Sequence, residues 1–297
     1  MSLRTLFLTN PGSRSGDCDF ALLAERLREN GHVELVRLER PKELPAAVRE
    51  YAGKVDRIVL GGGDGTVNLA LDALLEAGLP VGLLPLGTAN DLARSLEIPE
   101  NIDEAINIIL RGHLRKIDVA RANDVSFVNA IGMGLGPQMT REMDSNTKSR
   151  YGVLAYLIGI VRAFGRQRDF AARIESDHGR HEGHYIQITV ANGIHYGGGM
   201  TVADDARIDD GLLDVLLVRR QSRWSLLGSA LRFKLGHTRN ADYLSHWRCK
   251  SLSIETEHEL EVTADGEFLT CTPVECEMMP GALEFYAPEW PTGPIRS

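Results

Sequence analysis

Residues 56–78 read DRIVLGGGDGTVNLALDALLEAG, which is an apolar run, three consecutive glycines, Asp64-Gly65-Thr66 and then a helical pattern. A strand that passes through a tight turn into a helix is the repeating unit of parallel α/β sheets. Three glycines are more than a packed strand needs, and glycine is used where another group must approach the backbone closely. We therefore expect a ligand-binding turn in an α/β domain.

The same alternation of strand and helix patterns runs through the first part of the chain. Strand patterns fall at 4–10, 32–39, 56–60 and 79–86, and helical patterns at 20–30, 41–53, 66–78, 87–96 and 101–112. Strands separated by helices of about ten residues predict a parallel sheet with helices on both faces. We predict an α/β N-terminal domain with a parallel sheet and flanking helices over residues 1–120.

The pattern changes after Gly112 to short β-type runs separated by turn residues, with two helical segments at roughly 146–168 and 222–236. Many short strands between turns predict an antiparallel sandwich or barrel. We predict an all-β antiparallel sandwich C-terminal domain over residues 121–279. The last residues, 280–297, allow a return of the chain to the first domain.

Composition narrows the possible partners. Hydrophobic residues make up 43% and charged residues 25% of the chain, with a net charge of -8. A nucleic-acid-binding domain is expected to be basic, so no nucleic-acid partner is predicted. The four cysteines lack zinc spacing, and no N-terminal signal pattern is visible, which favours a cytoplasmic protein.

One helical segment leaves its role open. The longest uncharged apolar stretch, 151–161, is too short to span a bilayer. Arginines flank the helical segment at 150–168, so that this segment is either a core helix or a peripheral contact with the inner membrane.

Three strands of the predicted parallel sheet end in glycine-rich or polar loops. These loops are NPGSRSG (10–16), GGGDGT (61–66) and PLGTAND (85–91). Ligands of open α/β sheets bind outside the carboxyl ends of the strands, and a helix N-terminus offers N–H groups to an anion. Alternatively, the loops are ordinary turns with Thr66 and Thr88 as helix caps. Three such loops at neighbouring strand ends favour a phosphate-binding site.

Asp64 defines the kind of phosphate site. The loop lacks the lysine of a P-loop and the spacing of a dinucleotide-binding motif. A carboxylate beside phosphates calls for a divalent cation, and Mg2+ favours one or two carboxylates together with phosphate oxygens and water. Asp91 offers a second carboxylate, and Asn68 and Asn90 offer neutral polar contacts.

These segments resemble the diacylglycerol-kinase-type catalytic domain, in particular the bacterial soluble lipid kinases, a family that includes sphingosine and ceramide kinases. The resemblance implies a fold like that of NAD kinases and diacylglycerol kinases. The matching segments, in order, are NPGSRSG (10–16), GGGDGTVN (61–68), PLGTANDLAR (85–94), IDVARAND (117–124), FVNAIGMGLG (127–136), NGIHYGGGM (192–200), ARIDDGLLDV (206–215) and DGE (265–267).

The resemblance implies two binding sites. Asp64 and Asp91 would organise a Mg-ATP network, and a structural Mg2+ would be held by the Asp210 carboxylate and the backbone carbonyls of Arg207 and Leu212. Without the resemblance, this last stretch reads as a plain hairpin turn. The implied ATP-binding residues are Asn10, Pro11, Gly12, Ser13, Arg14, Gly62, Gly63, Asp64, Gly65, Thr66, Val67, Asn68, Leu69 and Thr88.

The resemblance also assigns a general base to the DGE tripeptide, either Asp265 or Glu267. An Asp-Gly pair is also a common β-turn. The implied activity is an ATP- and Mg-dependent lipid kinase acting on a lipid hydroxyl, with diacylglycerol, phosphatidylglycerol, ceramide or a sphingoid base as acceptor. The alternatives are a kinase of the same fold acting on a soluble substrate such as NAD, and a non-catalytic lipid-binding or sensor protein. The oligomeric state stays open, and a homodimer is allowed.

Overall fold

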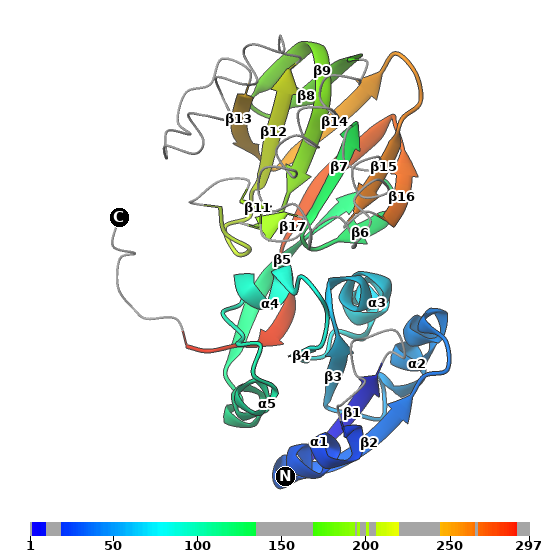
Figure 1. Cartoon of the computed structure of the whole chain (residues 1–297), viewed down its shortest axis with the longest axis vertical. Coiled ribbons are helices and arrows are strands. Elements are labelled where there is room, and N and C mark those ends of the chain that lie inside the picture. Colours follow the sequence, from blue (N-terminus) through cyan, green and yellow to red (C-terminus); the bar gives the residue numbers. More distant parts are fainter. Residues whose placement is uncertain are drawn as a thin grey trace, which may run out of the picture.

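The computed structural model describes residues 2–9, 19–134, 169–193, 195–196, 200–201, 206–219, 244–264 and 267–289. Figure 1 shows two lobes joined end to end: a helical lobe (residues 2–9 and 19–113) and a β lobe (the described residues of 123–273). The helical segments predicted at 146–168 and 222–236 lie outside the described residues. Within the described part, no helix has the length and apolar character needed to cross a membrane.

The helical lobe contains the predicted parallel sheet. Its strands are β1 (Leu3–Thr9), β2 (Gly31–Arg37), β3 (Arg57–Gly62) and β4 (Val81–Pro85). They pair in parallel in the order β2-β1-β3-β4. All residues of β3 and β4 are buried, as expected for strands covered on both faces.

Five helices connect these strands: α1 (Phe20–Leu27), α2 (Leu44–Tyr51), α3 (Asp64–Ala77), α4 (Asp91–Ser95) and α5 (Ile102–Arg111). Single 3-10 turns follow α1 at Arg28–Asn30 and precede α2 at Pro41–Glu43. Helix α1 packs against α5, and α2 packs against α3. Right-handed crossovers place these two pairs on opposite faces of the sheet.

Two helices begin at residues other than those the sequence predicted. Helix α3 starts at Asp64, with Gly63 as its N-cap, and α4 starts at Asp91 after Asn90, whose φ of 52° is left-handed. The alternative in which Thr66 and Thr88 cap these helices is therefore wrong. The first residue of each helix is instead an aspartate, the residue type that the positive end of a helix favours.

The β lobe is built from the predicted antiparallel strands. They are β6 (Val125–Phe127), β7 (Ala130–Gly134), β8 (Phe170–Ser176), β9 (Gly179–Ala191), β10 (His195–Tyr196), β11 (Met200–Thr201), β12 (Leu213–Arg219), β13 (Leu244–Cys249), β14 (Ser251–Thr256), β15 (Glu261–Ala264) and β16 (Glu267–Cys271). A second apolar core, including Phe127, Ile188 and Val215, fills this lobe. The predicted fold class, an α/β lobe followed by an antiparallel sandwich-like lobe, is confirmed.

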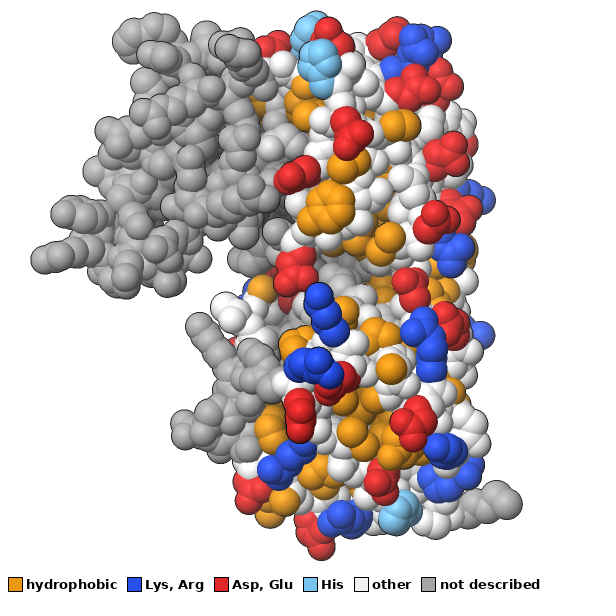
Figure 2. All heavy atoms as spheres, turned by 90° about the vertical axis from the view of Figure 1, so that its right-hand side faces the viewer, with side chains coloured by type: hydrophobic (Ala, Val, Ile, Leu, Met, Phe, Trp, Pro, Cys, Tyr) orange, Lys and Arg blue, Asp and Glu red, His pale blue; other side chains and the backbone are white. Residues whose placement is uncertain are grey.

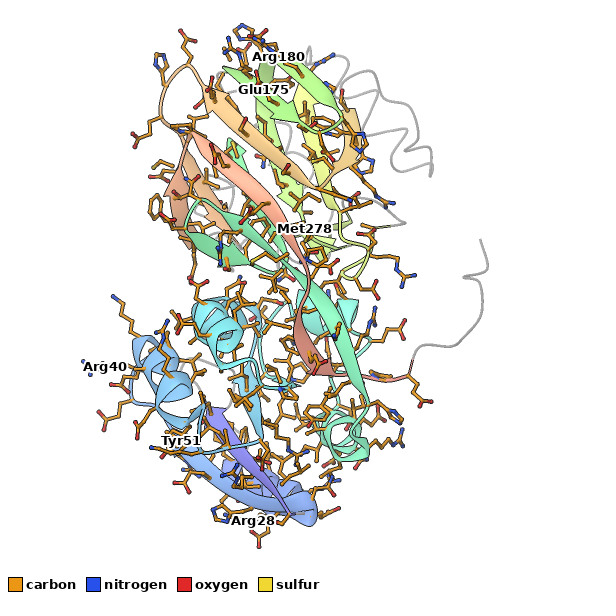
Figure 3. All side chains as sticks on the ribbon, turned by 180° about the vertical axis from the view of Figure 1, so that it is seen from behind. Arg28, Arg40, Tyr51, Glu175, Arg180 and Met278 are labelled. Atoms are coloured by element: carbon orange, nitrogen blue, oxygen red, sulfur yellow. The ribbon has the colours of Figure 1, made fainter. Side chains whose placement is uncertain are left out.

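Two long strands run through both lobes. They are β5 (Leu114–Ala122) and β17 (Val274–Tyr286), which pair with each other in antiparallel fashion. Strand β17 pairs with β14 in the β lobe and with β4 in the helical lobe, so that one continuous sheet links the lobes (Figure 1). Figure 3 shows the same arrangement from behind, with Met278 on β17.

The end of β17 belongs to the core of the helical lobe. Leu283 and Phe285 are buried among the residues of that core, whereas Val274 and Cys276 are buried in the other. The boundary expected near residue 120 falls inside β5. Residues 290–297, the end of the segment expected to return, lie outside the described residues. The exact domain limits stay a prediction.

Candidate functional site

The strand order of the helical lobe reverses direction between β1 and β3. From β1 the chain moves to β2 on one side, and it then crosses back to β3 on the other side. A reversal of this kind opens a ligand-binding crevice at the carboxyl ends of the two strands. These ends are Thr9 and Gly62. The predicted nucleotide contacts at 10–14 follow Thr9 directly and lie outside the described residues.

The two glycine loops at this edge touch each other. A Cβ atom built on Gly63 would lie 2.6 Å from the Cα of Gly87, and one built on Gly87 would lie 2.5 Å from the Cα of Gly63. A Cβ on Gly62 would meet the side chain of Thr66 at 2.3 Å. These glycines are therefore required by contacts within the protein. Gly65 differs, because a Cβ there would meet nothing within 4 Å and the residue is exposed.

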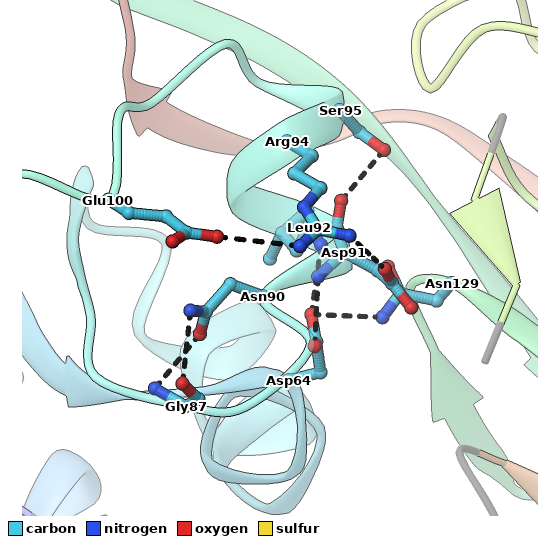
Figure 4. A network of polar contacts seen from close by, with 9 residues as sticks. All are labelled: Asp64, Gly87, Asn90, Asp91, Leu92, Arg94, Ser95, Glu100 and Asn129. Atoms are coloured by element: carbon cyan, nitrogen blue, oxygen red, sulfur yellow. Dashed lines mark hydrogen bonds and ion pairs between the residues drawn. The ribbon is translucent and has the colours of Figure 1, made fainter. Parts of the chain in front are cut away.

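Asp64 joins the two loops. Its Oδ2 accepts a hydrogen bond from the backbone N–H of Asp91 at 2.9 Å, and its Oδ1 accepts one from Leu92 N–H at 2.8 Å (Figure 4). These donors belong to the first turn of α4, where backbone N–H groups have no partner within the helix. The side chain of Asn129, which precedes β7, donates a third bond to Asp64 Oδ1 at 3.2 Å. Asp64 thus joins its own loop to two other segments, the start of α4 and the residue before β7.

The residues around Asp64 shape the second loop. Asn90 Oδ1 accepts from the N–H of Gly87 at 2.9 Å, and Asn90 Nδ2 donates to the carbonyl of Gly87 at 3.1 Å. Asp91 is 1% exposed, and its carboxylate lies 3.7 Å from the Arg94 guanidinium. Asn90 therefore closes its own loop, and the Asp91 carboxylate faces a cation of the protein.

The other predicted nucleotide-binding residues divide into two groups. Thr66 and Val67 are buried in the first turn of α3, and Asn68 is half-buried. Leu69 and Thr88 are exposed, as is Gly65. Of these three, Gly65 lies in the first turn of the fourteen-residue helix α3, where backbone N–H groups and the positive end of the dipole are available to an anion. We expect a phosphate to approach this exposed part of the loop.

Asp210 lies in the turn that leads into β12. Its Oδ1 accepts a hydrogen bond from Leu212 N–H at 3.0 Å. Burial raises the pKa of the Asp210 carboxyl, and the nearby Asp214 and Asp118 carboxylates raise the pKa further, against the opposing effects of Leu212 N–H and Arg248. A half-buried carboxylate beside two other carboxylates is stabilised by a cation, so these residues fit a bound divalent ion.

The metal ligands predicted from the sequence are the Asp210 carboxylate and the backbone carbonyls of Arg207 and Leu212. These are hard oxygen donors, which suit Mg2+. Among the described residues, no group of three or more His, Cys, Asp or Glu side chains could hold a metal ion. Arg207, the first residue of the set, forms an ion pair with Asp209 at 2.9 Å, which fixes the turn that carries Asp210.

The DGE turn begins beside the glycine loops. Strand β15 ends at Ala264, which pairs with Ile131 on β7, two residues from Asn129. Strand rise and spacing put the Cα atoms of Ala264 and Asn129 about 8 Å apart. Glu267 begins β16 and is exposed. Asp265 lies outside the described residues.

Sequence reasoning missed Asn129, Asn192 and Asp118, each of which is buried between the two lobes. Asn129 lies within the matching segment FVNAIGMGLG, but a single amide carries no spacing signal that assigns it a partner. Its contact with Asp64 joins residues 65 positions apart, and only the tertiary structure reveals it.

Comparison with known proteins gives a consistent result. Residues 4–122 match the family described as "Diacylglycerol kinase catalytic domain", and residues 129–287 match the "YegS C-terminal NAD kinase beta sandwich-like domain". A "Probable lipid kinase YegS-like" from Shewanella frigidimarina is 31% identical over 97% of this chain and 95% of its own length. A "Probable lipid kinase YegS" from Salmonella arizonae is 35% identical over 79% of each chain.

Solved structures agree with this assignment. A crystal structure from Bacillus anthracis superposes with a TM-score of 0.81 at 28% identity, covering 97% of this chain and 98% of the other. The structure of a diacylglycerol kinase from the same organism has a TM-score of 0.77 at 28% identity, covering 96% and 97%. The chain belongs to the lipid kinase family that combines a diacylglycerol kinase catalytic domain with a YegS-type C-terminal domain.

Proposed function

We propose that the protein is an ATP- and Mg-dependent kinase that transfers the γ-phosphate to a hydroxyl group of a lipid, such as diacylglycerol, phosphatidylglycerol, ceramide or a sphingoid base. The nucleotide would bind at the exposed N-terminus of α3, with Gly65, Leu69 and Thr88, and with residues 10–14. The acceptor would enter from the β lobe, beside the DGE turn.

The contact between Asp64 and Asn129 is the observation that supports this proposal most strongly. Asp64 comes from the glycine loop of the helical lobe, and Asn129 Nδ2 reaches it from the β lobe at 3.2 Å. The pairing of Ala264 with Ile131 brings the DGE turn to the same place. The proposed nucleotide side and the proposed acceptor side would therefore adjoin each other, as transfer between two substrates requires.

The chemistry divides among groups of this chain. Asp265 or Glu267 would accept the proton as the lipid O–H bond breaks, while the lipid oxygen bonds to the γ-phosphorus and the bond to the β-phosphate oxygen breaks to release ADP. Phosphoryl transfer depends on positioning and on electrostatic stabilisation more than on covalent help from the protein. Asp64 would hold the first turn of α4 through the N–H groups of Asp91 and Leu92, and the first turn of α3 would present N–H groups to the phosphates.

Two cation sites follow from the donor sets. A cation bound with the nucleotide would supply positive charge to the phosphate oxygens, and Asp64 and Asp91 would hold it through water. The Asp210 carboxylate with the carbonyls of Arg207 and Leu212 would hold a second, structural ion. Burial is the main cause of the raised pKa of Asp210, because it disfavours the charged carboxylate. A bound cation would stabilise that charge, which supports this role.

The surface beside the DGE turn supports a lipid acceptor. Phe268 follows Glu267 directly and is 63% exposed, an unusual position for a large apolar side chain. An acyl chain or a bilayer surface would cover it, which allows peripheral contact with the inner membrane. On the face shown in Figure 2, acidic and basic side chains are interspersed with apolar ones, so that neither sign of charge dominates this face.

Radiolabelled ATP tests the proposal. Purified protein would be incubated with MgCl2, labelled ATP and total bacterial lipid extract, and the labelled product would be identified by mass spectrometry. Ceramide and a sphingoid base would be added to the extract, and a parallel reaction would contain NAD in place of lipid. We expect label in one lipid class and none without Mg2+. Label appearing in NAD instead would establish the soluble-substrate kinase. Lipid binding to vesicles with no transfer to any lipid, ceramide and sphingoid bases included, would establish the non-catalytic alternative and overturn the proposal.

A further inference from the structure

Asn129 makes two hydrogen bonds that point in opposite directions. Its side-chain Nδ2 donates to Asp64 Oδ1 at 3.2 Å (Figure 4), and its backbone carbonyl accepts from the N–H of Asn192 at 2.7 Å. Asn129 and Asn192 are 3% and 2% exposed. Water competes little at such buried sites, so these bonds hold the groups that they join more firmly than surface bonds would.

The connection continues beyond Asn192. Asn192 Nδ2 donates to the backbone carbonyl of Asp118 at 2.8 Å. The Asp118 carboxylate, 3% exposed, accepts from the N–H groups of Gly211 at 2.6 Å and of Gly281 at 2.7 Å. Gly211 directly follows Asp210. A series of buried and half-buried hydrogen bonds therefore runs from the Asp64 carboxylate to the turn that carries Asp210.

The residue type at position 129 matters. The Asp64 carboxylate can only accept hydrogen bonds when ionised, so its neighbour must donate. An asparagine amide donates to Asp64, whereas an aspartate in the same place would set one carboxylate against another. Asp91 and Arg94 of α4 are the charged groups nearest to this contact, and they face each other at 3.7 Å.

We propose that Asn129 is a positioning residue, which fixes the Asp64 carboxylate for nucleotide binding. It also connects this carboxylate, through Asn192 and Asp118, to the turn that carries Asp210. The proposal rests on the proposed function in that Asp64 serves a nucleotide site. Groups that orient a functional carboxylate without touching the substrate change affinity or activity by roughly 10–100-fold when removed.

Substitutions at position 129 test the proposal. Asn129→Ala removes the donor, and Asn129→Asp keeps the shape while reversing the polarity. We expect both to weaken binding of Mg-ATP by roughly 10–100-fold and to raise the KM for ATP, with the KM for the lipid unchanged. The aspartate variant is expected to be the weaker binder, because two carboxylates then share one site.

Val128→Ala provides the matched control. Val128 is 1% exposed, adjoins Asn129 in sequence and packs in the core of the helical lobe. Its truncation lowers stability without removing a donor from Asp64, and wild-type nucleotide affinity is expected. If Val128→Ala and Asn129→Ala weaken binding equally at equal stability, Asn129 has a purely structural role, and the proposal is overturned.

Hydrogen exchange gives a second measurement that needs no nucleotide. The amide protons of Asp91 and Leu92 point to Asp64, and we expect them to exchange faster in Asn129→Ala than in Val128→Ala. Unchanged exchange would contradict the proposal. If wild type phosphorylates no lipid, calorimetric titration with Mg-ADP still compares the variants, so failure of the lipid-kinase assignment is distinguishable from failure of this one.

Asn192→Ala covers the case in which both variants at position 129 fail to fold. It interrupts the same series of bonds one residue further from Asp64. We expect it to weaken Mg-ADP binding in the same direction and by a smaller factor. Wild-type affinity for Mg-ADP in a folded Asn192→Ala protein would refute the connection to the turn that carries Asp210.

Discussion

The backbone N–H of Asp91 lies 2.9 Å from Oδ2 of Asp64, so that a side chain at the start of α3 stabilises the start of α4. The Leu92 N–H shares this carboxylate at 2.8 Å. A residue expected to interact with a cation thus also has a structural role, and the two roles predict different consequences of substitution.

Asp64→Asn with urea unfolding tests the structural role. The amide keeps the shape of the side chain but replaces one acceptor oxygen by a donor, which faces the N–H of Asp91 or Leu92. We expect a loss of about 1–3 kcal/mol in the free energy of unfolding, the cost of an unsatisfied buried group. Urea unfolding measures it. Asp72→Asn, at an exposed position of the same helix, is the control and should unfold like wild type.

Alanine substitution of the glycines tests the contact between the two loops. Gly63→Ala and Gly87→Ala each push a methyl group to within 2.6 Å or less of a backbone carbon. Overpacking of this kind typically lowers stability by about 1–3 kcal/mol. Gly65→Ala meets no atom within 4 Å, and in a helix alanine is favoured by up to about 1 kcal/mol. A Gly63→Ala protein as stable as Gly65→Ala would contradict the contact.

The ion pair between Asp56 and Arg4 should make the stability of the protein depend on pH. Hydrogen bonds from the Arg4 side chain and backbone lower the pKa of Asp56 from its ordinary value of 3.8 to about 2. The pKa of Asp56 is lower in the folded state than in the unfolded state. The ionised Asp56 therefore stabilises the fold above pH 4, and this contribution is lost as the pH falls through about 2. The difference in Tm between wild type and Asp56→Asn should shrink over this window. A difference that stays constant from pH 5 to pH 2 would refute it.

Mg2+ should stabilise the protein through Asp210 even without nucleotide. A ligand that binds only the folded state adds about 2.7 kcal/mol at a concentration of 100 times its Kd. We expect Tm to rise with MgCl2 in wild type and not in Asp210→Asn. Asp72→Asn is the control, because that side chain is exposed on α3 and belongs to neither proposed metal site. If Asp210→Asn responds to Mg2+ like wild type, the ion binds elsewhere.

Much of the helical lobe could be predicted because its signals are local. Apolar runs of five or six residues, each followed by a turn and a helical pattern, determine β3, α3 and β4 within a few residues. The helix starts could not be placed as well. Whether α4 starts at Gly87 or Asp91 depends on the left-handed Asn90 and on Asp64, a residue 27 positions away from Asp91.

The candidate site shows the same limit. The glycines and Asp64 stand out in the sequence because their residue types are unusual beside an apolar strand. The reason for two of these glycines cannot be read from the sequence. Gly63 and Gly87 lack side chains because their backbones contact each other in the folded protein. Asn129 also could not be assigned, since its partner is set by how the lobes meet.

The shared strands β5 and β17 bear on whether the catalytic-domain segment can be isolated. The segment that matches the catalytic domain ends at residue 122, yet Leu283 and Phe285 fill its core, and Phe285 pairs with Val81 on β4. A fragment truncated after residue 122 would expose the edge of β4 and leave two large side chains missing from its interior. Dissection of this enzyme into separately expressed halves is therefore expected to yield an aggregating N-terminal piece, unless residues 274–287 are supplied as a peptide.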